Sequence, residues 1–319
     1  MAFTHMPGVL CTGNIVIDTL VHPVDQLRWG ATTWVEMIGH SMGGNGANTS
    51  YALARLGVPV RLLSTVGDDR YGDEMLAGLR SAGVDTRSIT SVRGATATTI
   101  ALINSAGDRL FLHKPGVNRE ALPEPVEFTP WLLQGVSYFH LANPFALPAF
   151  RPHAAETLRR ARAAGLMTSL DAAWDSLGRW LEELGPCLAN VDLLFVNQQE
   201  AHMLTGLDDP LDGAKALHAA GARTVVVKLG ALGCMVLSRG GSFQVPAFEV
   251  DTLDTTGAGD CFAGGFLAAI QRGYTEVEAA RLANAVGALS VRRVGAVAGL
   301  LSWEETEEWM SMTKVRSQS

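Results

Sequence analysis

The sequence predicts an α/β fold in which a mostly parallel central sheet is flanked by helices on both faces, with a small β-sheet beside it. Two observations support this fold class. From Val136 onward, short apolar runs alternate with helical patterns, which implies parallel strands joined by crossover helices. Earlier in the chain, residues 19–42 and 97–115 contain strand-like runs that do not continue as helices. We expect those two segments to form the small sheet.

The composition predicts a protein with a large buried core. Its 319 residues are 47% hydrophobic and 18% charged, which suits one large α/β domain or two domains. A net charge of -7 provides no basic stripe, so we expect no nucleic-acid partner. The four cysteines lack paired spacing and the N-terminus lacks a signal-peptide pattern, so we expect a cytoplasmic protein. No uncharged apolar run approaches the ~20 residues of a membrane helix, so no membrane association is expected.

The first element is an apolar, β-rich run over Val9–Ile17, which predicts a buried strand that ends at Asp18. The residues alone favour a capping role for that carboxylate over a role in a site. A glycine cluster follows at Gly43, Gly44 and Gly46. It leads into a helix expected at Thr49–Leu56, and glycines before a helix allow a ligand to approach the backbone. Asn48 offers both a donor and an acceptor to a hydroxyl group.

The next predicted elements are a strand at Val60–Val66, a helix that ends at Gly83, and a hairpin. The hairpin pairs Thr98–Asn104 with Arg109–His113. A small sheet with an exposed apolar face is unstable alone, so it must cover a ligand or meet a partner. Its apolar side chains include Trp29, Trp34, Ile100, Leu102 and Phe111.

The second half of the chain predicts further strands, at Val136–Leu141, Met167–Leu170, Val191–Val196, Thr224–Lys228 and Cys234–Ser238, with a helix at Ala154–Ala164. Sites in parallel sheets lie beyond the carboxyl ends of the strands, where Asp171, Asn197 and Lys228 fall. Asn197 and Glu200 are three residues apart and project the same way from the first turn of a helix. A negative charge at this position is also favoured by the helix dipole, so capping alone is enough to explain Glu200.

The chain is organised around Asp254–Phe266, where small and polar residues lead into an apolar helix expected at Phe262–Ile270. The first turn of a helix presents free N–H groups that suit an anion, and Gly257–Gly259 leave them accessible. A carboxylate beside such an anion hole repels phosphate. Asp260 therefore suits this position only if its role is to take a proton from the attacking group. A short glycine-rich segment with an aspartate is, by itself, more often a simple cap.

The complete string Asp-Thr-Thr-Gly-Ala-Gly-Asp-x-Phe-x-Gly-Gly, residues 254–265, closely resembles the C-terminal signature of the ribokinase-like, or PfkB, family of carbohydrate kinases. Gly-Gly-x-Gly-Ala-Asn at residues 43–48 is similar to the N-terminal signature of that family, and Val-Gly-Asp-Asp-x-x-Gly at residues 66–72 also resembles it. The resemblance spans about residues 9 to 300. It implies a ribokinase-like fold and an ATP-dependent kinase that transfers the γ-phosphoryl group to a hydroxyl of a sugar or sugar derivative.

The resemblance also implies roles for residues. Asp260 corresponds to the catalytic base, and the backbone at Gly257, Ala258 and Gly259 to the anion hole. Substrate contacts are expected at Asp18, Gly43, Gly44, Asn45, Asn48 and Asp260. His113 lies where the small sheet returns to the core, where a substrate-specific contact would sit. The small sheet corresponds to a lid over the sugar, and because some members dimerise through it, a homodimer is expected.

The cofactors implied by the resemblance are ATP and Mg²⁺. Asn-x-x-Glu at Asn197 and Glu200 matches a motif that organises Mg²⁺, often through water. Nucleotide contacts are expected at Asn197, Lys228, Gly230, Gly233, Gly257, Gly259 and Asn284, the last near the adenine. In many relatives the residue matching Asp254 and a loop matching residues 295–299 hold a monovalent cation, usually K⁺. Here that loop offers carbonyl groups but no clear side-chain ligand.

These expectations divide the chain into a core of residues 1–18, 43–96 and 116–319 and a lid of residues 19–42 and 97–115. The acceptor stays open among ribose, fructose, another ketose, a sugar acid and a nucleoside. Val16 and Asn45 differ from some ribokinases, which weakens the case for ribose. A nucleoside kinase of the same family is the near alternative, and a lid aromatic stacked on a base would favour it. A non-catalytic sugar- or nucleotide-binding regulatory protein is the alternative of another class, but its expected mark, loss of Asp260 or of the glycine loop, is absent.

Overall fold

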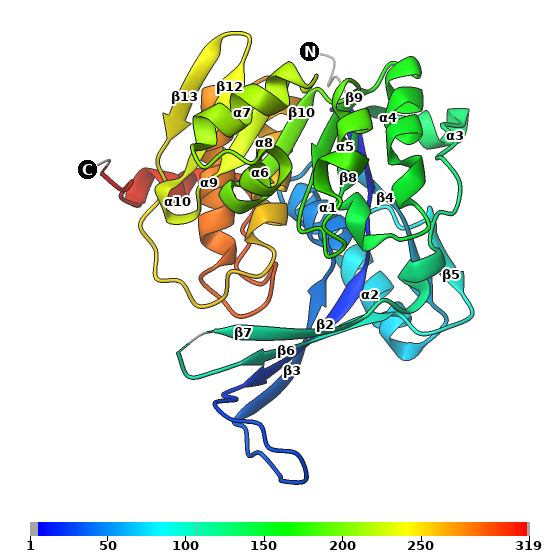
Figure 1. Cartoon of the computed structure of the whole chain (residues 1–319), viewed down its shortest axis with the longest axis vertical. Helices are drawn as coiled ribbons and strands as arrows, with labels where there is room; N and C mark the ends of the chain where they lie inside the picture. The colour runs from blue at the N-terminus through cyan, green and yellow to red at the C-terminus, as the bar shows by residue number, and fades with distance from the viewer. Residues whose placement is uncertain (1–5, 107, 318–319) are drawn as a thin grey trace.

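The computed structural model describes residues 6–106 and 108–317 and contains two sheets (Figure 1). The main sheet has the strand order β13-β12-β11-β10-β9-β8-β1-β4-β5. Its strands are parallel except at one edge, where β12 and β13 run antiparallel. The strands are β1 Gly8–Thr12, β4 Val60–Gly67, β5 Ile89–Val92, β8 Val136–Ala142, β9 Met167–Asp171, β10 Leu193–Asn197, β11 Thr224–Lys228, β12 Cys234–Ser238 and β13 Gly241–Val245.

Helices cover both faces of the main sheet. One layer consists of α1 Asn45–Arg55, α2 Arg70–Ser81, α8 Ala258–Gln271, α9 Glu276–Ser290 and α10 Trp303–Met312. The other consists of α3 Pro130–Leu133, α4 Ala154–Ala163, α5 Trp180–Leu188, α6 Gln198–Thr205 and α7 Pro210–Ala219. Alternate residues of β10 enter opposite cores: Phe195 packs with the α8 layer, whereas Leu194 and Val196 pack with the other. The predicted parallel sheet with helices on both faces is confirmed.

The second sheet, called the lid sheet here, has the order β3-β2-β6-β7 and projects from the main body (Figure 1). Its strands are β2 Val16–His22, β3 Met37–Gly43, β6 Ala97–Ile103 and β7 Arg109–Lys114. The predicted hairpin is confirmed, because β6 and β7 pair antiparallel. Short 3₁₀ turns occur at Gly116–Glu120, Pro144–Ala146, Arg151–His153 and Gly230–Leu232.

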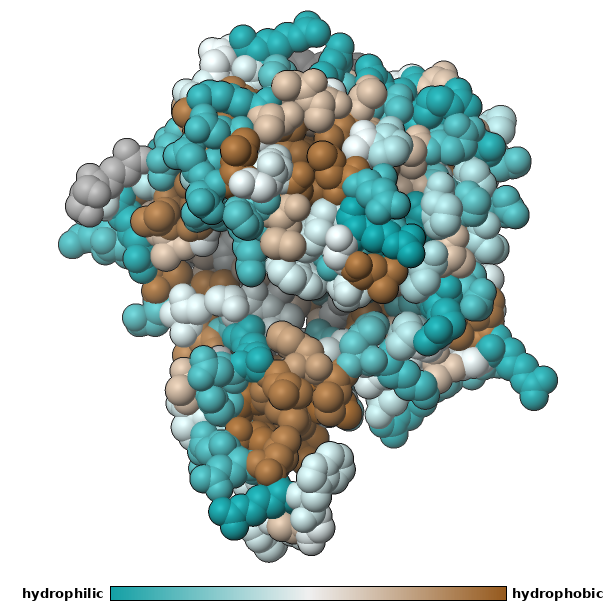
Figure 2. Space-filling model, in the orientation of Figure 1, coloured by the Kyte–Doolittle hydropathy of each residue, from teal (hydrophilic) through white to brown (hydrophobic). Residues whose placement is uncertain are grey.

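The two faces of the lid sheet differ in polarity. Asp18 pairs with Thr99, and Thr99 with His113, so these side chains share one face. Arg109, four residues before His113 on β7, lies on the same face and contacts the main body. The opposite face carries exposed apolar side chains: Ile38, Ile100, Leu110 and Leu112. Figure 2 shows an apolar patch over this sheet.

Three predicted boundaries are wrong. The single strand expected at Val9–Ile17 is two strands, because β1 ends at Thr12 and the chain turns away into β2. The turn needs glycine: a Cβ on Gly13 would lie 2.7 Å from the carbonyl oxygen of Ala142. Asp18 therefore lies inside a lid strand and does not end a strand of the main sheet.

The helices expected at 49–56 and 262–270 begin earlier. They start at Asn45 and at Ala258, so the polar residues of both motifs lie in a first helical turn. Among the residues that the structure describes, no helix is long and apolar enough to cross a membrane.

Candidate active site

Polar residues gather where neighbouring parallel strands of the main sheet end. Asp171, Asn197 and Lys228 are the last residues of β9, β10 and β11, and Asn143 follows β8 directly. Because β8 to β11 are adjacent and parallel, their carboxyl ends form one edge of the sheet. This is the edge at which α/β sheets bind ligands.

The first turn of α8 faces this edge and offers backbone amides. Gly257 is the N-cap with φ 70°, a left-handed conformation that favours glycine. A Cβ there would lie 2.5 Å from Cβ of Ala296. The Ala258 amide donates to the carbonyl of Thr255 at 3.3 Å. The amides of Gly257, Gly259 and Asp260 have no acceptor among the described residues, as expected at a helix N-terminus.

Asp260 lies beside these amides and is 6% exposed. Its two carboxylate oxygens accept hydrogen bonds from the side-chain amides of α1: Asn45 Nδ2 at 2.7 Å and Asn48 Nδ2 at 2.8 Å. Burial and the negative charge of Asp171 raise the pKa of Asp260 to about 6, against the lowering effect of the two asparagines. Near neutral pH this carboxyl group is therefore ionised but weakly acidic, as suits a general base.

Asn45 is itself fixed by two other asparagines. Its backbone N–H donates to Asn14 Oδ1 at 2.8 Å, and its Oδ1 accepts from Asn143 Nδ2 at 2.8 Å. A chain of amides thus runs from Asn143 through Asn45 to Asp260. The side-chain oxygens of Asn48, Asn118 and Asn143 are buried without a partner among the described residues. Unpaired buried acceptors are unfavourable, so each of these oxygens has an unmet capacity to accept a hydrogen bond.

Asp18 and His113 approach from the lid sheet. Burial raises the pKa of Asp18 to about 7, with smaller contributions from the charges of Asp254 and Asp260 and against the lowering effect of the Thr99 hydroxyl. His113 Nδ1 is 3.0 Å from the hydroxyl of Thr99, the residue that pairs with Asp18. A Cβ on Gly43 would overlap the Asp18 carboxylate, so glycine is required beside it.

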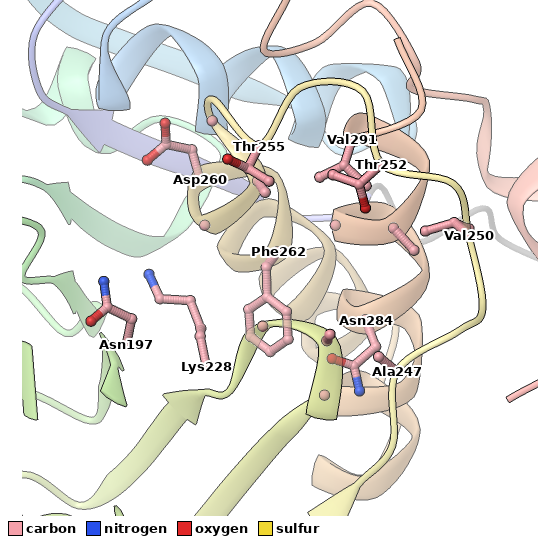
Figure 3. A pocket seen from close by; sticks show the side chains of 18 of the residues that line it. Asn197, Lys228, Ala247, Val250, Thr252, Thr255, Asp260, Phe262, Asn284 and Val291 are labelled. Atoms are coloured by element: carbon pink, nitrogen blue, oxygen red, sulfur yellow. The ribbon is translucent and has the colours of Figure 1, made fainter. Parts of the chain in front are cut away.

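A pocket of about 510 Å³ extends from Asp260 along α8 and α9 (Figure 3). In Figure 3, Asp260, Asn197 and Lys228 lie at one end, and Val250 and Asn284 at the other. The expected nucleotide residues that line it are Asn197, Lys228, Gly230, Gly233, Gly257, Gly259 and Asn284. Its other expected lining residues are Asn45, Glu200, Ala258 and Asp260.

The far end of the pocket has an apolar wall that the sequence did not reveal. It is formed by Ala247, Phe248, Val250, Ala288 and Val291. Asn284 is 6% exposed and donates to the carbonyls of Val245 and Pro246 at 3.0 and 3.2 Å. Residues 247–250 follow a short edge strand and lack regular periodicity, so no local pattern indicates this role.

Lys228 and Asp171 form an ion pair at the polar end of the pocket. Lys228 Nζ lies 2.9 Å from both Asp171 oxygens, and a Cβ on Gly259 would be 3.1 Å from Nζ. Burial lowers the pKa of Lys228, but Asp171 and Glu200 more than offset this, so its pKa is raised. The ammonium is therefore charged and close to the α8 amides, where it favours an anion.

Asn197 and Glu200 form a capping box at the start of α6. The Glu200 carboxylate accepts from Asn197 N and Nδ2, both at 2.7 Å, and the Glu200 N–H donates to Asn197 Oδ1 at 2.7 Å. Burial raises the pKa of Glu200, and Asp171 raises it further against the effect of Lys228. No cluster of three or more histidine, cysteine or acidic ligands occurs among the described residues. The two residues line the pocket and retain oxygen lone pairs, so they fit Mg²⁺ held through water.

Asp254 does not fit the monovalent cation implied by the resemblance. Its Oδ1 accepts from the Thr256 N–H at 2.8 Å and lies 3.0 Å from Arg109 Nη2, while its Oδ2 accepts from the Gly295 N–H at 2.8 Å. Protein donors, including a positively charged guanidinium, already engage both oxygens. Sequence reasoning missed Arg109, because its partners lie about 145 residues away.

The structure brings most but not all of the predicted residues into the pocket. Asp18, Gly43, Gly44, Asn48, His113 and Asp254 do not line it. Asn48 donates a hydrogen bond to Asp260, which does line the pocket. Asp18 and His113 lie on the inward face of the lid sheet, the face from which Arg109 contacts the main body. Asn14, Asn143 and Arg109 were not anticipated, since each acts through residues distant in sequence.

Comparison with known proteins identifies similar chains. The family model described as "pfkB family carbohydrate kinase" matches residues 6–303. An ATP-dependent ribose-1-phosphate kinase of Halopiger xanaduensis is 36% identical over 91% of this chain and 94% of its own. Fructokinase-1 of Oryza sativa is 30% identical over 81% and 84% of the two chains. An E. coli structure assigned as ribokinase II, solved with ATP and Mg²⁺, has TM-score 0.82 and 26% identity over 96% and 99%.

Proposed function

Because the chain belongs to the pfkB family of carbohydrate kinases and is an ATP-dependent sugar kinase, we propose that Asp260 takes the proton from the hydroxyl group that is phosphorylated. One observation carries this proposal. The Asp260 carboxylate lines the pocket beside the amides of Gly257 and Gly259, and two asparagines hold it in place. A base and an anion hole side by side are what phosphoryl transfer to an alcohol requires.

In the proposed reaction, the sugar hydroxyl donates its proton to Asp260 and its oxygen forms a bond to the γ-phosphorus of ATP. The bond from that phosphorus to the bridging oxygen breaks, and ADP leaves. The free amides at the start of α8 donate hydrogen bonds to the transferring group, and Lys228 adds positive charge. Asn45 and Asn48 keep the carboxylate aimed at the acceptor.

Mg²⁺ would be organised by Asn197 and Glu200 through water, and it supplies charge neutralisation for the phosphates when bound. We propose that the adenine lies at the apolar end of the pocket, near Asn284 and Phe248. The phosphates would then extend past Gly230 and Gly233 toward α8. In Figure 3, Asn197 and Lys228 lie at the end proposed for the phosphates, and Ala247 and Val250 lie at the end proposed for the adenine.

For the acceptor, we propose a sugar held on its hydroxyls by Asp18 and Asn48, with His113 nearby and with Gly43 and Gly44 giving close backbone approach. Asn48 supports this acceptor, because it bonds to Asp260 and its own side-chain oxygen is buried without a partner among the described residues. Ribose 1-phosphate is the first sugar to test, since a relative so named is 36% identical to this chain. Fructose and ribose follow from the names of other relatives.

A nucleoside acceptor is the second candidate. Phe111 lies on the inward face of the lid sheet, in line with Arg109, and is 55% exposed, so a base could stack on it. Trp29 is fully exposed and makes no comparable case. A non-catalytic regulatory protein is disfavoured because the carboxylate and the free amides are all present.

A second copy of this chain is the proposed partner of the lid sheet. Leu110 and Leu112 on its outer face are 52% and 53% exposed, beside Ile38 and Ile100. Apolar surface of this kind marks an interaction site. Leu112→Glu should convert a dimer into a monomer in light scattering, and a monomeric parent protein would contradict the proposal.

The second sheet also supports treating residues 19–42 and 97–115 as a lid on the core.

A cytoplasmic location is also proposed. Cys11, Cys187, Cys234 and Cys261 are free and buried, which suits a reducing compartment.

An ATP-consumption assay over a panel of acceptors tests the proposed function. The panel contains ribose 1-phosphate, fructose, ribose, a sugar acid and nucleosides, each with Mg²⁺ and ATP. Sugar-dependent ADP formation supports the proposal. Ligand-induced thermal shifts without ADP formation on any acceptor would instead support binding without turnover.

A further inference from the structure

Arg109 connects the lid sheet to the loop that forms the anion hole. It lies on β7, and its side chain is 15% exposed. Its Nη2 lies 3.0 Å from Asp254 Oδ1, and its Nη1 donates to the hydroxyls of Thr255 and Thr256 at 3.2 and 3.0 Å. The guanidinium thus contacts three successive residues immediately before the N-cap of α8.

Asp254 joins two loops around this contact. Its side chain is 3% exposed, and it accepts the backbone N–H groups of Thr256, in the loop before α8, and Gly295, in the loop after α9. The second loop packs on the first, since a Cβ on Gly257 would meet Ala296 at 2.5 Å. The position of the α8 amides therefore depends on a buried carboxylate.

That carboxylate needs a positive partner. Asp254 is buried three residues before the N-cap of α8, and Asp260 is buried in the first turn of that helix, so two acidic groups flank the amides where phosphate charge would develop. A buried carboxylate without a partner is unfavourable, and it also repels a phosphate nearby. Within the described chain, Arg109 is the basic residue that forms an ion pair with Asp254.

We infer that Arg109 is a built-in cation of the anion hole: its guanidinium neutralises Asp254 and holds the loop, so that this enzyme works without a monovalent metal ion. Arg109 is a positioning residue, because it acts on the reaction through Asp254 and the α8 amides. Since it comes from the lid sheet, the lid supplies the charge that completes the hole. The inference rests on the proposed function of the α8 amides.

The experiment compares the parent protein with Arg109→Met and Arg109→Lys, in potassium chloride and in choline chloride at equal ionic strength. The control is Arg28→Met, because Arg28 is an exposed lid residue whose side chain bonds only to Gln26 among the described residues. Turnover and the melting temperature are both measured. The parent and control should show the same kcat/KM for ATP in both salts and no potassium-dependent thermal shift.

Arg109→Met should lose about 10-fold or more in kcat/KM for ATP, somewhat less than removal of a direct oxyanion donor. Potassium or added guanidinium ion should restore part of that loss and raise the melting temperature of this variant alone. Arg109→Lys should remain independent of potassium. The inference is overturned if potassium activates or stabilises the parent protein, or if Arg109→Met keeps parental activity in choline chloride.

These outcomes separate this inference from the proposed function. Absence of turnover in the parent protein with every acceptor contradicts the kinase mechanism. The thermal-shift comparison of the parent in the two salts still tests the role of Arg109, and it does not require any variant to fold.

Discussion

Removing Asn45 should raise the pKa of Asp260 and move the acidic limb of the pH–rate profile upward. Asn45 Nδ2 donates to Asp260 Oδ1 at 2.7 Å, and this bond favours the ionised carboxylate. A hydrogen bond to a charged group contributes about 1.5–3 kcal/mol, and one pKa unit corresponds to about 1.4 kcal/mol. In Asn45→Ala the pKa should therefore rise by about 1 to 2 units from its value of about 6.

The assay is the pH dependence of kcat/KM for the sugar, which reports the pKa of groups in the free enzyme. The sequence also implies that Asn45 contacts the sugar, so the value of kcat/KM is expected to fall, and only the position of the limb tests the reasoning. Asn104→Ala is the control, since Asn104 makes its bonds to Asp108 at the exposed lid hairpin. An Asn45→Ala limb that stays in place, or moves to lower pH, would refute the link between this bond and the base.

Three further predictions concern Gly257, Asp18 and Lys228. Gly257→Ala places a Cβ 2.5 Å from Ala296 at φ 70°. The strain should lower the free energy of unfolding by about 1–3 kcal/mol, which lowers the melting temperature, and it should also lower kcat. Parental kcat in this variant would contradict the need for that turn. Burial raises the pKa of Asp18 from 3.8 to about 7. Between pH 3.8 and about 7, the folded protein therefore keeps a proton that the unfolded chain has lost. The free energy of unfolding should fall as the pH rises through this range. Asp18→Asn should remove that slope, worth up to about 4 kcal/mol, in urea unfolding at several pH values; an unchanged slope would show that Asp18 is not its source. Lys228→Met breaks the buried pair with Asp171, at a cost of about 3–5 kcal/mol, and should raise KM for ATP; unchanged KM and melting temperature would contradict the proposed phosphate contact.

The sequence predicts the fold well because its signals are local. Apolar runs such as Val60–Val66 and Thr224–Lys228 are strands in the structure, at nearly the expected bounds. The helix α7 was missed although Asp209 followed by Pro210 is a start signal, with Asp209 accepting from Leu211 and Asp212. The break at Gly13 could not be predicted, because the neighbouring backbone that forces it belongs to distant segments.

The candidate site divides in the same way. The motif around Gly257 and Asp260 is continuous in sequence, so its anion hole and carboxylate can be proposed from sequence. Asn143 and Arg109 carry no local signal. Their partners, Asn45 and Asp254, lie 98 and about 145 residues away, and only the folded chain brings each pair together.

The most direct test of the central claim is the turnover of Asp260→Asn with an active sugar, measured beside the affinity of the variant for that sugar by calorimetry. Asparagine keeps the size of the side chain but cannot take a proton, and loss of a general base lowers the rate about 10²- to 10⁴-fold. The account predicts a loss of kcat in that range with sugar affinity largely retained. A kcat close to that of the parent protein would contradict it.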